Sequence, residues 1–156
     1  MAWLFPWLLF LHVLAAIVAF GPTFASPVAA SLVAREPQHA NFFARSQMLV
    51  SKRLITPLAL SLGVTGILMV LVTGIDLTQA LWLGVAIVLY VIAVGFALLV
   101  QTPNGARLVE LTGAPSPGGP SPELLTTAAA VRRGGMLLAV LVVTIVFLMV
   151  VKPGAA

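Results

Sequence analysis

The sequence predicts an all-α integral membrane protein, a four-helix bundle, and two observations carry this prediction. Hydrophobic residues make up 61% of the 156-residue chain and charged residues only 8%, whereas an ordinary soluble domain is about 25% charged. Four apolar stretches, at about 3–33, 54–72, 80–100 and 134–151, are long enough to cross the bilayer as helices. Backbone polar groups in lipid must pair internally, which favours helices. We therefore expect a single transmembrane domain over 1–156.

The first apolar stretch is expected to be a span rather than a signal peptide. No Lys or Arg precedes it, and it is longer than the roughly 7–15-residue apolar core of a signal peptide. Gly21, Pro22 and Pro27 lie within it. A straight helix from Trp3 to Val33 would measure ~46 Å and exceed the ~30 Å hydrocarbon core, so we expect it to kink, tilt or protrude.

The distribution of basic residues predicts the orientation. The first and third loops carry seven Lys or Arg residues, whereas the second loop carries none and contains Asp76. The positive-inside rule therefore places the first and third loops in the cytoplasm and both termini outside; Lys152 is the one charge that disagrees. The basic loop residues are Arg35, Arg45, Lys52, Arg53, Arg107, Arg132 and Arg133.

Two features mark the two membrane surfaces. The basic pairs Lys52–Arg53 and Arg132–Arg133 lie at the expected inner surface, where they suit contact with anionic lipid headgroups or with an acidic partner. The three tryptophans, Trp3, Trp7 and Trp82, all fall at the expected outer surface. They are typical of an interfacial aromatic belt.

The first loop is expected to be helical. Glu36-Pro37 suits a helix start, and Phe42, Phe43, Met48 and Leu49 give an amphipathic stripe. This segment either extends the second span into the cytoplasm or lies on the inner headgroups. Pro57, just inside the second span, predicts a local kink.

The third loop divides into a short helix, a connector and the start of the fourth helix. Residues 104–112 suit a short helix, and the Gly- and Pro-rich stretch 113–122 predicts a flexible connector. Ser121-Pro122-Glu123 is a favourable helix start, with a Ser cap and Pro at the first position. The fourth helix is therefore expected to begin in the cytoplasm, well before Arg132.

His12 is the main candidate for a functional residue. It lies ~13 Å beyond Trp3 and thus near the bilayer midplane, where ionisable groups point to function. Thr65, Tyr90 and Thr144 fall at a similar depth on the other spans. These four residues predict a buried polar layer or cofactor site, and the alternative is a neutral His12 that fixes helix packing by a hydrogen bond.

The chemistry open to His12 includes haem ligation, metal ligation and proton relay. One monomer cannot hold a haem between His12 and His39, because 27 residues separate them and His39 lies in the loop. The second ligand would come from His12 of another copy or from Met69 or Met149. Small-residue pairs, among them Ala25 with Ala29, suit close packing of helices.

Most enzyme classes find no support in the sequence. The chain has no cysteine, no clustered His and carboxylates and no Walker-type glycine loop. Its high isoelectric point reflects few charges rather than a basic surface for nucleic acid. Catalysis is therefore not expected.

Two apolar motifs resemble known families. Leu11–Gly21, LHVLAAIVAFG, resembles the first helix of small bacterial membrane families that include relatives of the copper-resistance D membrane domain. Phe147–Pro153, FLMVVKP, resembles the last helix of a bacterial family of four-helix predicted integral membrane proteins. The resemblance implies a bacterial inner-membrane protein with a His near the start of its first helix, and it implies no particular activity.

The sequence thus favours a non-enzymatic role. We expect a small polytopic protein that acts as a subunit, scaffold or lipid-contacting partner in a larger membrane assembly, with the lipid bilayer and other subunits or a second copy as its partners. One alternative is a haem- or redox-cofactor protein that uses His12. The other is a small transporter or channel built from several copies.

Overall fold

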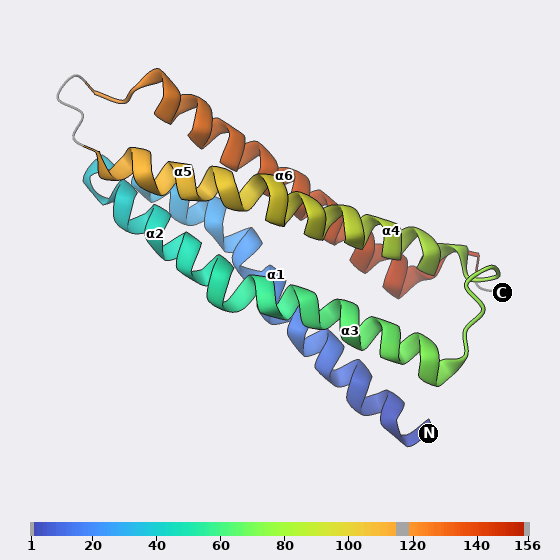
Figure 1. The fold of residues 1–156 in the computed structure, drawn as a ribbon. Helices are drawn as coiled ribbons and strands as arrows, with labels where there is room; N and C mark the ends of the chain where they lie inside the picture. Colours follow the sequence, from blue (N-terminus) through green and yellow to red (C-terminus); the bar gives the residue numbers. More distant parts are fainter. Residues whose placement is uncertain (1, 115–118, 155–156) are drawn as a thin grey trace.

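The computed structural model describes residues 2–114 and 119–154 and arranges them in four long helical rods (Figure 1). The first rod is α1 (Phe5–Val33), entered through the 3-10 turn Ala2–Leu4. The second joins the 3-10 turn Pro37–His39, α2 (Ala40–Val50), the π-helical segment η3 (Ser51–Ile55) and α3 (Thr56–Thr73). The third joins α4 (Leu81–Phe96), the π-helical segment η4 (Ala97–Gln101) and α5 (Thr102–Gly113), and the fourth is α6 (Pro122–Val151).

The expected fold class is confirmed, because each rod is long and apolar enough to cross a membrane. The four candidates are Phe5–Val33, Pro37–Thr73, Leu81–Gly113 and Pro122–Val151. At 1.5 Å per residue their lengths are about 44, 55, 50 and 45 Å, all above the ~30 Å hydrocarbon core. Each expected span coincides with part of one rod, apart from Ala80 just before the third, and its limits stay a prediction. Which end of the bundle is cytoplasmic also stays a prediction.

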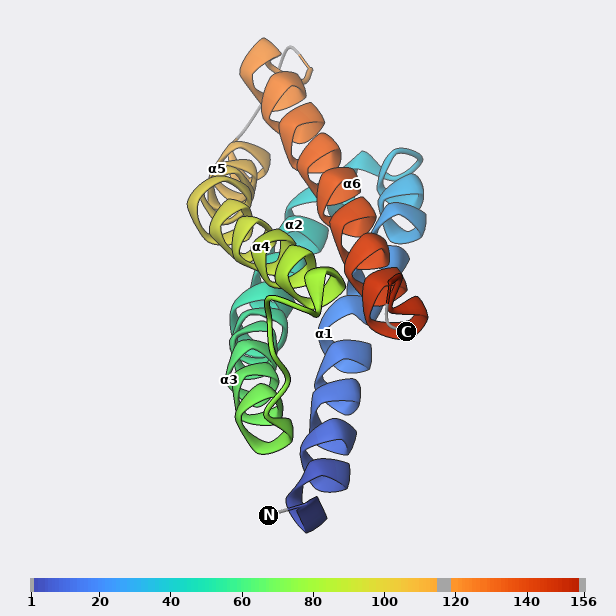
Figure 2. The same ribbon diagram turned by 90° about the vertical axis from the view of Figure 1, so that its right-hand side faces the viewer.

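The bundle has two chemically different ends. The basic end contains the α1–α2 turn, α2, α5 and the start of α6; the tryptophan end contains the chain termini and the α3–α4 turn (Figure 1). Between the rods, α1 packs mainly on α3, and α4 packs mainly on α6 (Figure 2). At the basic end, α2 packs on α5 and α5 packs on α6. The α1–α3 pair and the α4–α6 pair are therefore joined mainly at the basic end, through the contact of α2 with α5.

Small residues form the core. Among the described residues, the buried hydrophobic set is Ala15, Ala19, Ala44, Leu62, Ala80, Leu83, Ala86, Ala93 and Val142. Such residues let helix backbones approach closely, which is how membrane helices pack. The pair that serves α1 is Ala15 and Ala19, whereas Ala25 is exposed. The expected pair at Ala25 and Ala29 therefore does not supply the packing face of this helix.

Both π-helical segments stand just before a Thr-Pro pair. Pro57 follows η3, and Pro103 follows η4. A proline ring clashes with the carbonyl four residues earlier, and a wider turn with bonds to the fifth residue relieves that clash. The disturbance expected at Pro57 thus takes the form of a π-helical turn. The first rod runs on unbroken past Pro22 and Pro27.

The connecting segments agree with the sequence in most respects. The first loop is helical and extends the second rod, as the first of the two alternatives predicts; where the headgroups lie along this rod stays a prediction. Ser121 caps α6 by accepting a hydrogen bond from the Leu124 amide at 3.1 Å. The predicted flexible connector, 113–122, includes residues 115–118, which lie outside the described residues.

In the α3–α4 turn the Asp76 carboxylate accepts hydrogen bonds from the Thr78 hydroxyl and amide, and these lower its pKa.

Candidate functional site

His12 meets one of its expected partners in the part of the bundle nearer the tryptophan end. Its Nδ1 lies 2.8 Å from the Thr65 hydroxyl oxygen, which links α1 to α3. Both residues are half-buried, and the edge of the imidazole faces Gly66, where a Cβ would lie 3.6 Å from Cε1. A small residue on α3 therefore makes room for the ring.

The hydroxyl of Thr65 sets the proton arrangement of this pair. It lies 2.9 Å from the Ser61 carbonyl and 3.2 Å from the Leu62 carbonyl of its own helix. The hydroxyl has a single proton, and when that proton is donated to these carbonyls, the neutral His12 ring donates from Nδ1–H. Nε2 is then the acceptor nitrogen of the ring.

Tyr90 crosses from α4 to the same helix α3 but at another place. Its hydroxyl donates to the Ala59 carbonyl at 2.8 Å. The contact depends on Gly63, because a Cβ there would lie 2.7 Å from the Tyr90 oxygen. Tyr90 is thus held against the backbone of α3, within the two turns that precede Thr65.

Thr144 stands apart from these contacts. Its hydroxyl donates to the Val140 carbonyl of its own helix at 2.9 Å. The four expected residues therefore do not form one connected layer: His12 and Thr65 pair, Tyr90 bonds the α3 backbone, and Thr144 serves only α6. Equal depth in the membrane does not determine the direction in which a side chain points.

Gln101, at the end of η4, makes a hydrogen bond to another helix that the sequence did not predict. Its Nε2 donates to the Val131 carbonyl of α6 at 2.9 Å. Its Oε1 is buried without a hydrogen-bond partner among the described residues. This oxygen lies against the buried Gly134, where any Cβ would overlap it. An amide at the end of the apolar stretch 80–100 is the only sequence signal for this contact.

Two further amides join helices at the basic end. Asn41 of α2 donates to the Val109 carbonyl of α5 at 2.9 Å and to the Thr112 hydroxyl at 3.2 Å. Gln47 donates to the Ser26 hydroxyl, which in turn donates to the Pro22 carbonyl at 2.7 Å. These bonds tie α2 to α5 and to the proline-containing part of α1.

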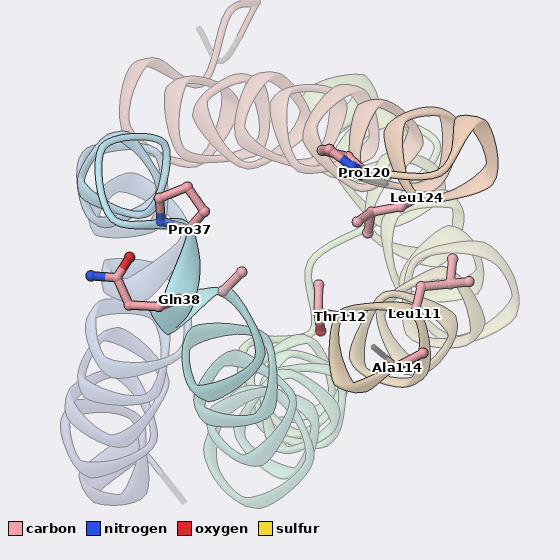
Figure 3. Close-up of a pocket in the computed structure, with 9 residues that line it drawn as sticks. Pro37, Gln38, Leu111, Thr112, Ala114, Pro120 and Leu124 are labelled. Atoms are coloured by element: carbon pink, nitrogen blue, oxygen red, sulfur yellow. The ribbon is translucent and has the colours of Figure 1, made fainter. Parts of the chain in front are cut away.

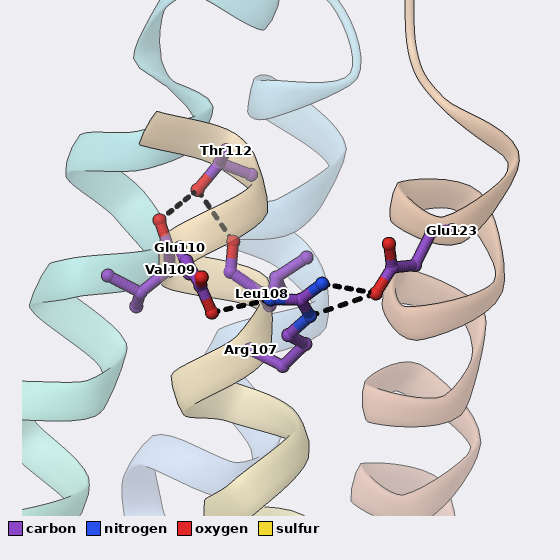
Figure 4. Close-up of polar contacts among 6 residues, drawn as sticks. All are labelled: Arg107, Leu108, Val109, Glu110, Thr112 and Glu123. Atoms are coloured by element: carbon purple, nitrogen blue, oxygen red, sulfur yellow. Dashed lines mark hydrogen bonds and ion pairs between the residues drawn. The ribbon is translucent and has the colours of Figure 1, made fainter. Parts of the chain in front are cut away.

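An exposed ion-pair cluster links α5 to α6. Arg107 contacts Glu110 on its own helix and Glu123 near the start of α6 (Figure 4). Its Nε donates to Glu123 at 2.9 Å and its Nη1 to Glu110 at 2.6 Å. Exposed pairs contribute little stability singly, ~0–1 kcal/mol. The cluster does engage two of the four acidic residues of the chain.

Two open hollows lie at the basic end. One, of about 360 Å³, is bordered by the Pro37 turn, the end of α5 near Leu111 and the start of α6 near Leu124 (Figure 3). The other, of about 550 Å³, is termed here the α2 groove. It is lined by Phe42, Arg45, Ser46, Met48, Leu49, Lys52 and Val109.

The charged residues expected at the membrane surfaces are exposed. Lys52 and Arg53 lie on η3, and Arg132 and Arg133 lie on α6 just before Gly134. Lys152, the charge that disagrees with the orientation rule, places its ammonium 5.6 Å from the centre of the Trp82 ring. This cation–π contact joins the end of α6 to the start of α4 at the tryptophan end.

Comparison with known proteins places the chain in a family. Residues 6–153 match the family described as "Predicted integral membrane protein (DUF2269)". The chain belongs to this family. The match covers nearly the whole chain and thus parts of all four rods; a relation to the copper-resistance D membrane domain stays a prediction. No curated protein and no solved structure matches the chain.

The geometry of this family member defines what chemistry its residues can perform. Within residues 2–114 and 119–154, no three His, Asp or Glu side chains gather as a metal site. The His12–Thr65 pair can pack helices, exchange a proton or offer Nε2 to a ligand. The α2 groove can bind a surface of opposite charge with an apolar centre.

Proposed function

We propose that the protein is a non-enzymatic subunit or scaffold of a larger assembly in a bacterial inner membrane, with its basic end in the cytoplasm. Family membership and four apolar rods support the membrane location. The excess of Lys and Arg at the basic end supports the orientation. The role as a subunit rests on one observation at the basic end.

That observation is an exposed apolar surface, which the predicted limits of the second span place outside the membrane. The predicted span 54–72 has 19 residues and measures ~29 Å, about the thickness of the ~30 Å hydrocarbon core. Phe42 lies twelve residues before Leu54 on the same rod, so it stands ~18 Å beyond the core. The headgroup layer is only ~5–8 Å deep. Phe42 is nevertheless 74% exposed, which favours a protein contact there. Leu49, at the depth of the headgroups, is 61% exposed and continues this surface toward the membrane.

A size measurement on membranes tests this function. The protein is extracted from its native membrane in a mild detergent, and the mass of the particle and its protein content are measured. We expect a particle that contains a second kind of protein and that dissociates in the variant with Phe42→Ser and Leu49→Ser. The control is Leu125→Ser, because Leu125 is 59% exposed on α6 at the same end. A particle that contains one copy of this chain alone would refute the proposal.

The same measurement separates the transporter alternative. A particle made of several copies of this chain and no other protein would favour an oligomeric transporter or channel. Each outcome is read from the composition of the particle rather than from its mass alone.

The proposed orientation has its own test. The natural chain lacks cysteine, so single cysteines can be labelled without background. In intact cells, Thr78→Cys is expected to react with a membrane-impermeant maleimide and Ser116→Cys is not. The reverse labelling pattern would refute the cytoplasmic location of the basic end.

A cofactor protein is the second candidate, and one observation favours it. The Nδ1 atom of His12 is engaged by Thr65, which directs the ring and leaves Nε2 to ligate iron or to accept a hydrogen bond, as second-shell hydrogen bonds do for ligand histidines. A visible absorption spectrum of the purified protein tests this. A Soret band that disappears in His12→Asn would support haem, and a colourless protein from haem-replete cells would exclude it.

A further inference from the structure

The α2 groove has a repeating pattern that specifies its partner. Phe42 and Leu49 are seven residues apart, and so are Arg45 and Lys52. Seven residues make two helical turns, ~10.5 Å, so each pair lies along one side of α2. The groove therefore carries two exposed apolar side chains beside two exposed cations in matching register.

The position of the groove favours a protein over a lipid. Lys52 and Leu49 lie ~3 and ~8 Å above Leu54, which is within reach of headgroups. Arg45 and Phe42 lie ~14 and ~18 Å above it, beyond the headgroup layer. A phospholipid would cover only the lower half of the groove, whereas a helix laid along α2 covers all of it.

The charge of the groove argues against a second copy of this chain. The whole second rod, from Pro37 to Thr73, contains no Asp or Glu. Two α2 segments placed face to face would bring four cations together at low separation. The acidic residues of the neighbouring α5 and α6, Glu110 and Glu123, are engaged by Arg107.

We propose that the α2 groove binds an acidic amphipathic helix of another protein, with apolar side chains on Phe42 and Leu49 and carboxylates on Arg45 and Lys52. Helix-in-groove binding of this kind uses apolar anchors at two-turn spacing. The charges select the partner and its register. This proposal names the partner of the proposed subunit function and rests on it.

A defined peptide tests the chemistry. The probe is a fluorescent helical peptide of about three heptads with Leu and Glu at seven-residue spacing, and its match has Lys in place of every Glu. Binding to the purified full-length protein in an uncharged detergent is followed by fluorescence anisotropy. We expect the Glu peptide to bind and the Lys peptide not to bind.

Matched variants separate the groove from general charge attraction. Arg45→Glu with Lys52→Glu is expected to weaken binding of the Glu peptide about tenfold or more. Arg132→Glu with Arg133→Glu makes the same change of net charge away from the groove and is expected to change binding by less than about twofold. Leu49→Ser is expected to weaken binding about tenfold, and Leu125→Ser is not. Equal effects in either matched pair would overturn the proposal.

Two further outcomes distinguish the possible failures. If phosphatidylglycerol in nanodiscs displaces the Glu peptide, and phosphatidylcholine does not, the groove is a lipid site and the proposal is wrong. If the particle extracted from native membranes stays intact in the variant with Arg45→Glu and Lys52→Glu, the acidic-helix proposal fails while the subunit function stands. A particle with no second protein would overturn the subunit function itself.

Discussion

Replacement of Gly134 by alanine tests the packing between α4 and α6. A Cβ at Gly134 would overlap Gln101 Oε1 and lie 3.2 Å from both Gln101 Cδ and Phe96 Cε1. The Gln101 amide would have to move and give up its hydrogen bond to the Val131 carbonyl. Overpacking costs ~1–3 kcal/mol, and a hydrogen bond between membrane helices contributes ~0.6 kcal/mol.

The neighbouring glycine provides the control for this variant. A Cβ at Gly135 would lie 3.9 Å from Gln101 Nε2, which is an ordinary contact. Both variants gain the same helix propensity of ~1 kcal/mol, so that term cancels in their comparison. We therefore expect Gly134→Ala to be less stable than Gly135→Ala by about 1.5–3.5 kcal/mol.

Reversible unfolding in mixed micelles, followed by circular dichroism, measures this difference. Removal of the overlapping atoms by Gln101→Ala is expected to restore part of the stability lost in Gly134→Ala. If the free energies of unfolding of Gly134→Ala and Gly135→Ala agree within ~0.5 kcal/mol, close to the spread typical of neutral substitutions, the packing described here is wrong.

Two more sets of substitutions test the contacts of His12 with Thr65 and of Tyr90 with α3. A double-mutant cycle of His12→Leu and Thr65→Val is expected to give a coupling of ~0.6–1.7 kcal/mol, and His12→Asn should retain more stability than His12→Gln because the contact uses Nδ1; an absent coupling would contradict the pair. Gly63→Ala is expected to destabilise by ~0–2 kcal/mol, because its clash with the Tyr90 hydroxyl costs ~1–3 kcal/mol and alanine gains ~1 kcal/mol of helix propensity over glycine. Addition of Tyr90→Phe should recover part of that loss, and equal unfolding free energies for Gly63→Ala with and without it would refute the contact.

Composition and the four apolar stretches were sufficient to predict the class of fold and the number of rods. The local sequence also predicted the helix starts at Pro37 and Pro122, because proline and its neighbours act locally. Depth gave Thr65 as one of three possible partners of His12, since residues at one level on adjacent helices are able to meet, and Thr65 is the one that His12 contacts.

The sequence did not predict contacts that depend on helix rotation. Thr144 lies at the expected depth but bonds its own helix. Ala15 and Ala19 are buried whereas Ala25 is exposed, and an alanine-rich helix has no polar stripe to distinguish its faces. The hydrogen bond of Gln101 to α6 was not predicted, because a single amide at the end of an apolar stretch resembles an ordinary span boundary.

The two π-helical segments together determine which faces of α2 and α5 contact each other. A π-helical turn is equivalent to one residue inserted into an α-helix, and each residue corresponds to a rotation of ~100°. Deletion of one residue from η3 alone would turn α2 about its axis and carry Met48 away from Gly105, where the two now sit in close contact. The same deletion in η4 would turn α5 away from α2. Deletion of one residue from either segment is therefore expected to disrupt the contact between α2 and α5.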